Sequence, residues 1–212
     1  MYRPPSFRED DLDALHDFVE ARGFGLLVTA AADGPRVDAL PFLLDRGAGK
    51  KGVLRAHLAR ANPQVAALRE GGPALVVVSG LDAYVSPGWY PSKAGTGKVV
   101  PTWNYELVQI RGAARLVDDP AWIAAQIGAL TERHERGFAR PWRVTDAPAD
   151  FIAAQMRAIV GLEILVDRVE GKFKLSQNRG AADRAGVRAG LSAAGREDMA
   201  EAMRRADSRH AD

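Results

Sequence analysis

The strongest constraint on the fold is a tight turn signal, Asp33-Gly34, that lies between two apolar runs. The first run covers Phe24 to Ala30 and the second covers Arg36 to Leu44, and this arrangement is typical of a β-hairpin. Pro41 in the second run favours an edge strand or a bulge at that point. The sequence therefore predicts antiparallel strands in its first part.

Further strand-like segments follow along the chain. We expect a strand ending near His57, strands over Ala74 to Ser79 and around Ala83 to Ser86, a long extended stretch from Val99 to Val117, and a closing hairpin of Leu162 to Val169 and Lys172 to Ser176 around Glu170-Gly171. Six or seven antiparallel strands usually hide their edges by closing into a barrel. The expected fold class is α+β, with a barrel at its centre.

Helix signals lie between and after these strands. We expect a helix opened by a capping box of Ser6 and Glu9 and ended by Gly23, a short helix after Asn62-Pro63, a helix after Asp118-Asp119-Pro120, and a helix from about Ala149 to Val160. After Arg179 the chain is rich in alanine, arginine and glycine and shows no large apolar face. We therefore expect residues 1–178 to form the domain and residues 179–212 to form a loose or partly helical tail.

Aromatic residues and prolines are densest between Tyr84 and Tyr105. Prolines stiffen loops, and aromatic side chains offer flat surfaces with polar tips. Together with the lysines of this stretch they suit a flat, anionic, heterocyclic ligand. A rim that packs on the edge of its own domain explains the same residues equally well.

Composition excludes several classes of protein. The chain has 29 basic and 27 acidic residues, a formal charge of +2, which does not indicate the concentrated basic face of a nucleic-acid binder. Cysteine is absent, which excludes disulfides and thiolate chemistry and fits a reducing compartment. The start does not resemble a signal peptide, and no apolar run approaches the roughly 20 residues of a membrane span. We expect a cytoplasmic protein with no membrane segment.

The best candidate for an anion site is the segment from Arg55 to Pro63, where a strand leads into a short helix. Arg60 can form charge-assisted hydrogen bonds to a phosphate, and His57 is a further donor. An ordinary helix cap with an exposed arginine is the alternative. Other chemistry finds little support, because the sequence contains no nucleophile elbow, no phosphate-binding glycine loop and no spaced histidine pair for a metal.

Several short motifs together resemble the PaiB family of FMN-binding negative transcriptional regulators. The matching stretches are His57 to Pro63, Tyr84 to Pro87 with Trp89-Tyr90, Val100 to Tyr105, Leu130-Thr131 with His134-Glu135, Pro141-Trp142 with Asp146 to Pro148, Ile159 to Gly161 with Glu163, and Lys174 to Asn178. Each motif is short, but they follow one another in the order of the family from Tyr2 to about Leu191.

The resemblance implies a split antiparallel β-barrel with flanking helices, related to pyridoxamine phosphate oxidases, and a homodimer that binds FMN. The residues themselves predict no metal site. With the resemblance, these cofactor-binding residues are predicted: His57, Arg60, Asn62, Ser86, Trp89, Lys98, Trp103, Asn104, Ser176 and Gln177. Ala39 stands where relatives carry a histidine, and Leu81 where they tend to carry proline. These departures leave open whether a reaction has been lost.

Two functions remain open at this stage. The first is a flavin-binding regulator, in which FMN changes the contacts of the dimer; DNA binding enters through the resemblance alone. The second is a flavin-dependent oxidoreductase that acts on a small molecule, with the protein positioning the flavin ring. An FMN-free dimeric scaffold is a third alternative, and catalytic residues are not identified by the sequence.

Overall fold

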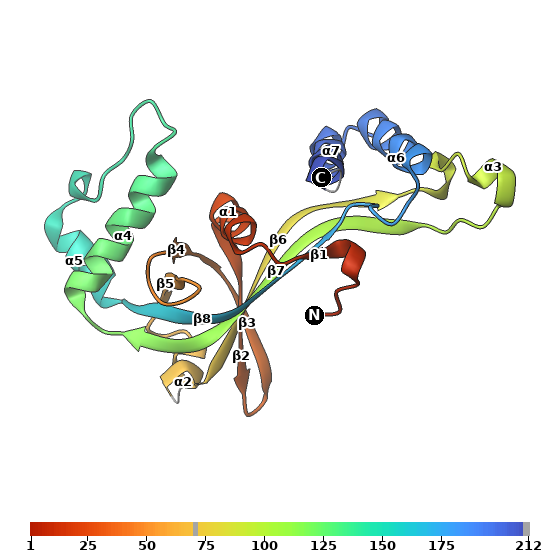
Figure 1. Ribbon diagram of the computed structural model, residues 1–212. Helices are drawn as coiled ribbons and strands as arrows, with labels where there is room; N and C mark the ends of the chain where they lie inside the picture. Colours follow the sequence, from red (N-terminus) through yellow and green to blue (C-terminus); the bar gives the residue numbers. More distant parts are fainter. Residues whose placement is uncertain (70–71, 210–212) are drawn as a thin grey trace. The chain divides into compact units, whose positions relative to one another are not determined.

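The computed structural model describes residues 1–69 and 72–209 and contains one antiparallel sheet with several helices (Figure 1). The sheet has the order β3-β2-β6-β7-β8-β5-β4, and β1 pairs with β8 outside this path. The strands are β1 (Arg8–Glu9), β2 (Phe24–Ala31), β3 (Gly34–Pro41), β4 (Leu43–Asp45), β5 (Val53–Ala59), β6 (Pro73–Val85), β7 (Thr102–Val117) and β8 (Ile159–Lys174).

The helices of the described residues lie at the ends of these strands. The α-helices are α1 (Leu12–Arg22), α2 (Gln64–Arg69), α3 (Lys93–Thr96), α4 (Pro120–Glu135), α5 (Ala149–Arg157), α6 (Ala181–Ala193) and α7 (Glu197–Arg209). Three short 3-10 helices are η1 (Pro5–Phe7), η2 (Pro87–Trp89) and η3 (Val144–Asp146). No helix in the described part of the chain is long and apolar enough to cross a membrane.

The predicted α+β class and its antiparallel strands are confirmed. The sheet has eight strands rather than six or seven, because β1 and β4 are too short to produce a periodic pattern. The sheet does not close into a barrel within the described residues, since its path begins at β3 and ends at β4. The expectation of a closed barrel is therefore corrected to an open sheet.

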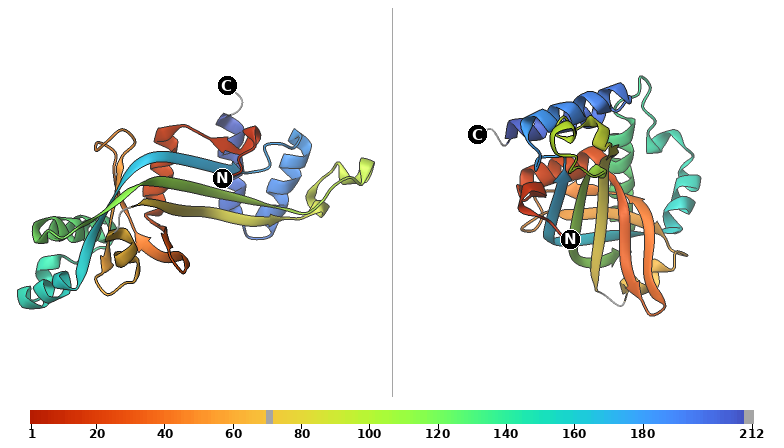
Figure 2. Two further views of the ribbon diagram at one scale, coloured as in Figure 1. Left: turned by 90° about the horizontal axis from the view of Figure 1, so that it is seen from below. Right: turned by 90° about the vertical axis from the view of Figure 1, so that its right-hand side faces the viewer.

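The hairpin predicted at Asp33-Gly34 is confirmed. Strands β2 and β3 pair antiparallel from Phe24↔Pro41 to Ala31↔Gly34, and Figure 2 shows them as a long two-stranded ribbon. Gly23 ends α1 with φ +61°, a left-handed conformation that favours glycine, and its N–H donates to the carbonyl of Val19 at 2.9 Å. The start of this helix differs from the prediction, because Ser6 lies in η1 and Glu9 in β1.

The hairpin predicted around Glu170-Gly171 is wrong, because β8 continues through both residues. Strand β1 pairs there, with Glu9 opposite Gly171. The buried carboxylate of Glu170 forms an ion pair with Arg3, with Oε1 3.3 Å from Nε. This partner comes from the start of the chain, so the pairing has no local signature and the two residues resemble a turn. The end predicted for the helix after Ala149 is also too late, since α5 ends at Arg157 and Gly161 belongs to β8.

The chain forms two compact units that share the three longest strands. The first unit contains residues 1–11, 79–108 and 170–212, and the second contains residues 12–78 and 109–169. Strands β6, β7 and β8 each begin in one unit and end in the other. The domain boundary expected after residue 178 stays a prediction, because compactness does not by itself show which part folds alone.

The C-terminal segment forms two helices of the first unit, α6 and α7, which lie side by side (Figure 1). Val187, Leu191, Met199 and Met203 are buried together with Val85 and Tyr90 in one apolar cluster. The sequence suggested a looser tail, because these apolar side chains are spaced among alanines and arginines rather than in one continuous run. In the second unit, Leu27 of β2, Leu54 and Leu58 of β5, and Ile164 of β8 are fully or nearly fully buried.

Candidate functional site

The turn between β5 and α2 is organised by Asn62. Its Oδ1 accepts a hydrogen bond from the N–H of Gln64 at 2.8 Å, which caps the first turn of α2, as the Asn-Pro signal predicts. Its Nδ2 donates to Asp38 Oδ2 at 2.9 Å, which ties the turn to β3. Both ends of the amide are therefore engaged within the protein. In this structure Asn62 shapes the turn that presents Arg60.

Arg60 lies at the surface of this turn with its guanidinium in an ordered position. Nε donates to the carbonyl of Arg157 at 2.8 Å, and one terminal nitrogen donates to Asp118 Oδ2 at 2.8 Å while the other pairs with Oδ1. The hydrogen bond to Asp118 raises the pKa of Arg60, and the same contact lowers the pKa of Asp118. The Asp118 side chain is exposed and that of Arg60 is partly exposed, so an incoming anion that reaches the guanidinium would compete with a single carboxylate.

His57 lies on β5, before the turn that carries Arg60, and is opposite Gly161 of β8. Its Nδ1 is buried and has no hydrogen-bond partner among the described residues. Burial lowers the pKa of His57 below its usual value, because an imidazolium is poorly solvated there. The imidazole is thus neutral at pH 7, with one ring nitrogen left for a further partner.

Glu163 of β8 holds α4 against the sheet next to this turn. Its Oε1 accepts a hydrogen bond from Trp122 Nε1 at 2.8 Å, and its Oε2 pairs with Arg115. The Trp122 ring packs directly on Gly161, where an added Cβ would lie 2.3 Å from the ring. These contacts fix the first turn of α4. They therefore also fix Asp118, which lies just before that turn.

In the first unit, an exposed aromatic pair lies on β6 and β7. Trp103 is 53% exposed and Tyr84 is 47% exposed, and their rings meet edge to face with centroids 6.0 Å apart. Lys174 of β8 donates to Thr102 Oγ1 at 2.5 Å and to the carbonyl of Trp103. Burial, with help from Lys172 and Arg179, lowers the pKa of Lys174. This part of the first unit therefore carries two exposed aromatic rings on β6 and β7, while the ammonium group of Lys174 is held by the start of β7.

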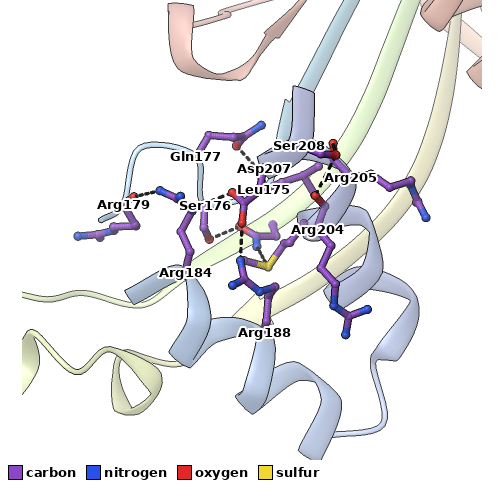
Figure 3. A network of polar contacts seen from close by, with 12 residues as sticks. Leu175, Ser176, Gln177, Arg179, Arg184, Arg188, Arg204, Arg205, Asp207 and Ser208 are labelled. Atoms are coloured by element: carbon purple, nitrogen blue, oxygen red, sulfur yellow. Dashed lines mark hydrogen bonds and ion pairs between the residues drawn. The ribbon is translucent and has the colours of Figure 1, made fainter. Parts of the chain in front are cut away.

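Asn104, Ser176 and Gln177 are held by internal hydrogen bonds. Figure 3 shows Ser176 and Gln177 in the loop that follows β8. Ser176 has φ +67° and donates through Oγ to Asn104 Oδ1 at 3.0 Å, while Asn104 Nδ2 lies 3.4 Å from the sulfur of Met203. Gln177 accepts from the N–H of Leu175 at 2.7 Å and donates to the carbonyl of Phe173 at 2.6 Å. In this structure these three polar side chains stabilise the loop between β8 and α6.

The remaining three predicted residues lie in the loop region of the first unit. Ser86 caps η2, since its Oγ accepts from the N–H of Gly88 at 3.1 Å. The Trp89 ring lies against α6, where a Cβ added at Gly190 would come within 2.3 Å of it. Lys98 is exposed, and no partner of its ammonium group is seen among the described residues. Of these three, Lys98 alone presents a charge to solvent.

The structure groups the ten predicted residues by unit. His57, Arg60 and Asn62 lie in the second unit, and the other seven lie in the first. Each unit by itself offers groups that suit a part of FMN: the second has a guanidinium for a phosphate and a buried imidazole nitrogen without a partner, and the first has exposed indole and ammonium groups that suit a flat ring with carbonyl edges. Among the described residues there is no group of three or more His, Asp or Glu side chains that fits a metal ion.

The sequence missed three residues of these surroundings. Asp118 was expected only as part of the helix start Asp118-Asp119-Pro120; Asp119 forms that cap by accepting from the N–H of Ala121 at 2.9 Å, and Asp118 pairs with Arg60 instead. Lys174 was grouped with its polar neighbours without a role of its own. Arg157, whose carbonyl receives Arg60, carried no signal at all, because its position depends on a contact between segments 97 residues apart.

Comparison with known proteins places the chain in a family whose description names FMN binding. The family described as "Putative FMN-binding domain" matches residues 1–168, and the chain belongs to this family. FMN, the cofactor implied by the resemblance, is the cofactor that this family's description names. A protein of Emericella nidulans is 34% identical over 226 residues, covering 90% of each chain. Protease synthase and sporulation protein PAI 2 of Bacillus subtilis is 29% identical over 186 residues, covering 86% of this chain and 85% of its own. The resemblance to the PaiB family is confirmed.

Solved structures share the fold at low sequence identity. The flavocytochrome Anf3 from Azotobacter vinelandii has a TM-score of 0.58 at 15% identity, covering 82% of this chain and 72% of its own. An FAD and heme binding protein from Mycobacterium smegmatis also has a TM-score of 0.58, at 20% identity, covering 84% of this chain and 78% of its own. At these identities the likeness concerns the fold alone.

Proposed function

We propose that this protein is an FMN-dependent regulatory protein of the PaiB kind, in which Arg60 binds the FMN phosphate. The observation that carries the proposal is the exposed guanidinium of Arg60, oriented by the carbonyl of Arg157 and balanced by the single carboxylate of Asp118. A phosphate offers the guanidinium the same two-oxygen geometry as Asp118 with a larger negative charge. Exchange of one anion for the other requires no buried group to move.

The side chains around Arg60 have distinct roles in this proposal. Asn62 fixes the turn by capping α2, and His57 contributes a neutral imidazole with an unpartnered nitrogen. Bound FMN would supply a ring that accepts and donates electrons. In the first unit, the predicted FMN contacts stay predictions, each to be tested by its own substitution: Ser86, Trp89, Lys98, Trp103, Asn104, Ser176 and Gln177.

We propose regulation through protein contacts of a homodimer rather than through a basic face of the C-terminal helices. Arg184 and Arg188 both pair with Asp207, and Arg204 pairs with Glu197 and Glu201. Arginines already neutralised within the helical pair add little to the phosphate contacts that dominate DNA affinity. These pairs support an indirect role in transcription, in which FMN changes the contacts that the protein makes with a partner.

The decisive experiment is a titration of the purified protein with FMN, followed by absorption and flavin fluorescence. Arg60→Ala should lower the affinity by at least about tenfold, the usual loss when a charge-assisted pair is removed. Arg46→Ala is the matched control, because Arg46 is equally exposed and pairs with Asp17 and Glu20 in the same unit. Equal affinities for the wild-type protein and the Arg60 variant would refute the assignment.

Two further measurements separate a regulator from an oxidoreductase. A regulator acting through protein contacts should show FMN-dependent changes in its association state by sizing with light scattering, without bleaching of the flavin by NADH or NADPH. Rapid bleaching and reoxidation with turnover would favour the oxidoreductase instead. Sequence-selective DNA binding with a steep salt dependence would show that regulation is direct.

A further inference from the structure

A cavity of about 610 Å³ lies between α4, η3 and α5 in the second unit. Its apolar walls include Pro120, Ile123, Val144, Ile152, Ala153 and Met156. Cavities of roughly 300 to 1,000 Å³ with mostly apolar walls are the usual size of small-molecule sites. The volume and lining therefore suit one small organic molecule.

Helix α5 leaves its apolar side chains incompletely covered. None of its residues is buried, although Ile152 and Met156 both face the cavity. Ile123 of α4, on the opposite wall, is 2% exposed, so its side chain is already packed in the protein. Filling the space between the two helices would remove apolar surface of α5 from water, which favours binding of an apolar body.

Arg157 supplies a charge at this apolar cavity. Its guanidinium has no partner among the described residues, while Arg60, which also lines the cavity, is held by Asp118. The nearest acidic residue on α5, Asp150, accepts the N–H of Phe151 at 2.9 Å. A ligand that combines an apolar body with one acidic group would satisfy both the walls and this arginine.

We propose that this cavity binds a small organic acid with an apolar body, its anionic group pairing with Arg157. The site is additional to the FMN phosphate site, because its cation is Arg157 rather than Arg60 and its walls are side chains of α4 and α5. A ligand here would pin α5 to α4 beside Arg60. It would thus act as an effector of the FMN-dependent regulator. This effector role rests on the function proposed above.

The test uses FMN-saturated protein and decanoate, measured by isothermal titration calorimetry. Decanoate should bind with one site per chain, and decanol, which has the same chain without the charge, should bind about tenfold more weakly. Arg157→Gln should reduce the affinity for decanoate to that for decanol. Arg140→Gln, which changes an exposed arginine outside the cavity lining, should leave both affinities unchanged.

A second variant tests the apolar walls. Met156→Glu places a carboxylate in the cavity from a partly exposed position, so the protein should keep its circular dichroism spectrum and lose binding of both ligands. The proposal is overturned if wild-type protein fails to bind decanoate, if the Arg157 variant binds it as well as wild type, or if FMN and decanoate compete for one site. The last outcome would leave FMN binding itself intact, whereas failure of Arg60→Ala to weaken FMN would refute only the phosphate assignment.

Discussion

Replacing Asp118 with asparagine should tighten FMN binding if Arg60 grips the phosphate. In the structure both oxygens of Asp118 engage the Arg60 guanidinium, so the phosphate must displace this carboxylate before it can bind. The pair lies at the surface, with the Asp118 side chain 64% exposed. Surface ion pairs are weak, so its removal should improve affinity by about two- to fivefold. The carbonyl of Arg157 still orients the guanidinium through Nε in the variant.

The neighbouring aspartate gives a closely matched control. Asp119→Asn changes the net charge by the same amount one residue away, but Asp119 caps α4 and is not seen to contact Arg60. Asparagine is an equally good cap, so this variant should fold normally and bind FMN as wild type does. The assay is FMN fluorescence quenching at low ionic strength, repeated at high salt, where the gain should shrink. The reasoning is refuted if Asp118→Asn binds FMN no better than wild type, or if both variants improve equally.

Further predictions follow from the same contacts. Trp103→Ala should weaken FMN binding yet cost less than about 1 kcal/mol in urea unfolding, because the ring is 53% exposed; a large loss of stability would contradict this surface placement. Gly190→Ala should destabilise the protein by about 1–3 kcal/mol, since its Cβ would lie 2.3 Å from the Trp89 ring, whereas Gly128→Ala, with open space around it in α4, should be neutral or stabilising in thermal melts. Because burial lowers the pKa of His57 below its usual 6.5, the unfolded chain takes up the extra proton first; stability against urea should therefore fall as the pH drops below about 6.5 and be retained above it. His57→Gln should flatten that decline, while exposed His134→Gln should not.

Local signals predicted much of the fold. The Asp33-Gly34 turn, the Asn62 cap and the end of α1 at Gly23 each depend on a few adjacent residues, and all three are confirmed. The turn expected at Glu170-Gly171 failed because the pairing of β1 with β8 and the ion pair from Arg3 come from residues more than 150 positions away. Strand pairing with a distant segment can override the local tendency to form a turn, and a single sequence does not show which segments pair.

The candidate site was predictable in part. Arg60 and its turn follow from the order of strand, arginine and helix cap, but the partner Asp118 lies 58 residues later and has no sequence signal of its own. Trp103, predicted as a cofactor-binding residue, is 53% exposed, because alternation along β7 places it on the face opposite buried Asn104. In the family motif Lys174 to Asn178, the side chains of Lys174, Ser176 and Gln177 bond to their own loop and to β7.

The continuity of β6, β7 and β8 through both compact units limits how this protein can be divided or rearranged. Separating one unit from the other would require cutting three strands in mid-length, so each piece would keep only part of each of these strands. Truncated versions made at any of these points should expose unpaired strand ends and precipitate. Gene fusion or duplication in this lineage would therefore have to retain the whole sheet and add new segments at the termini or in the loops.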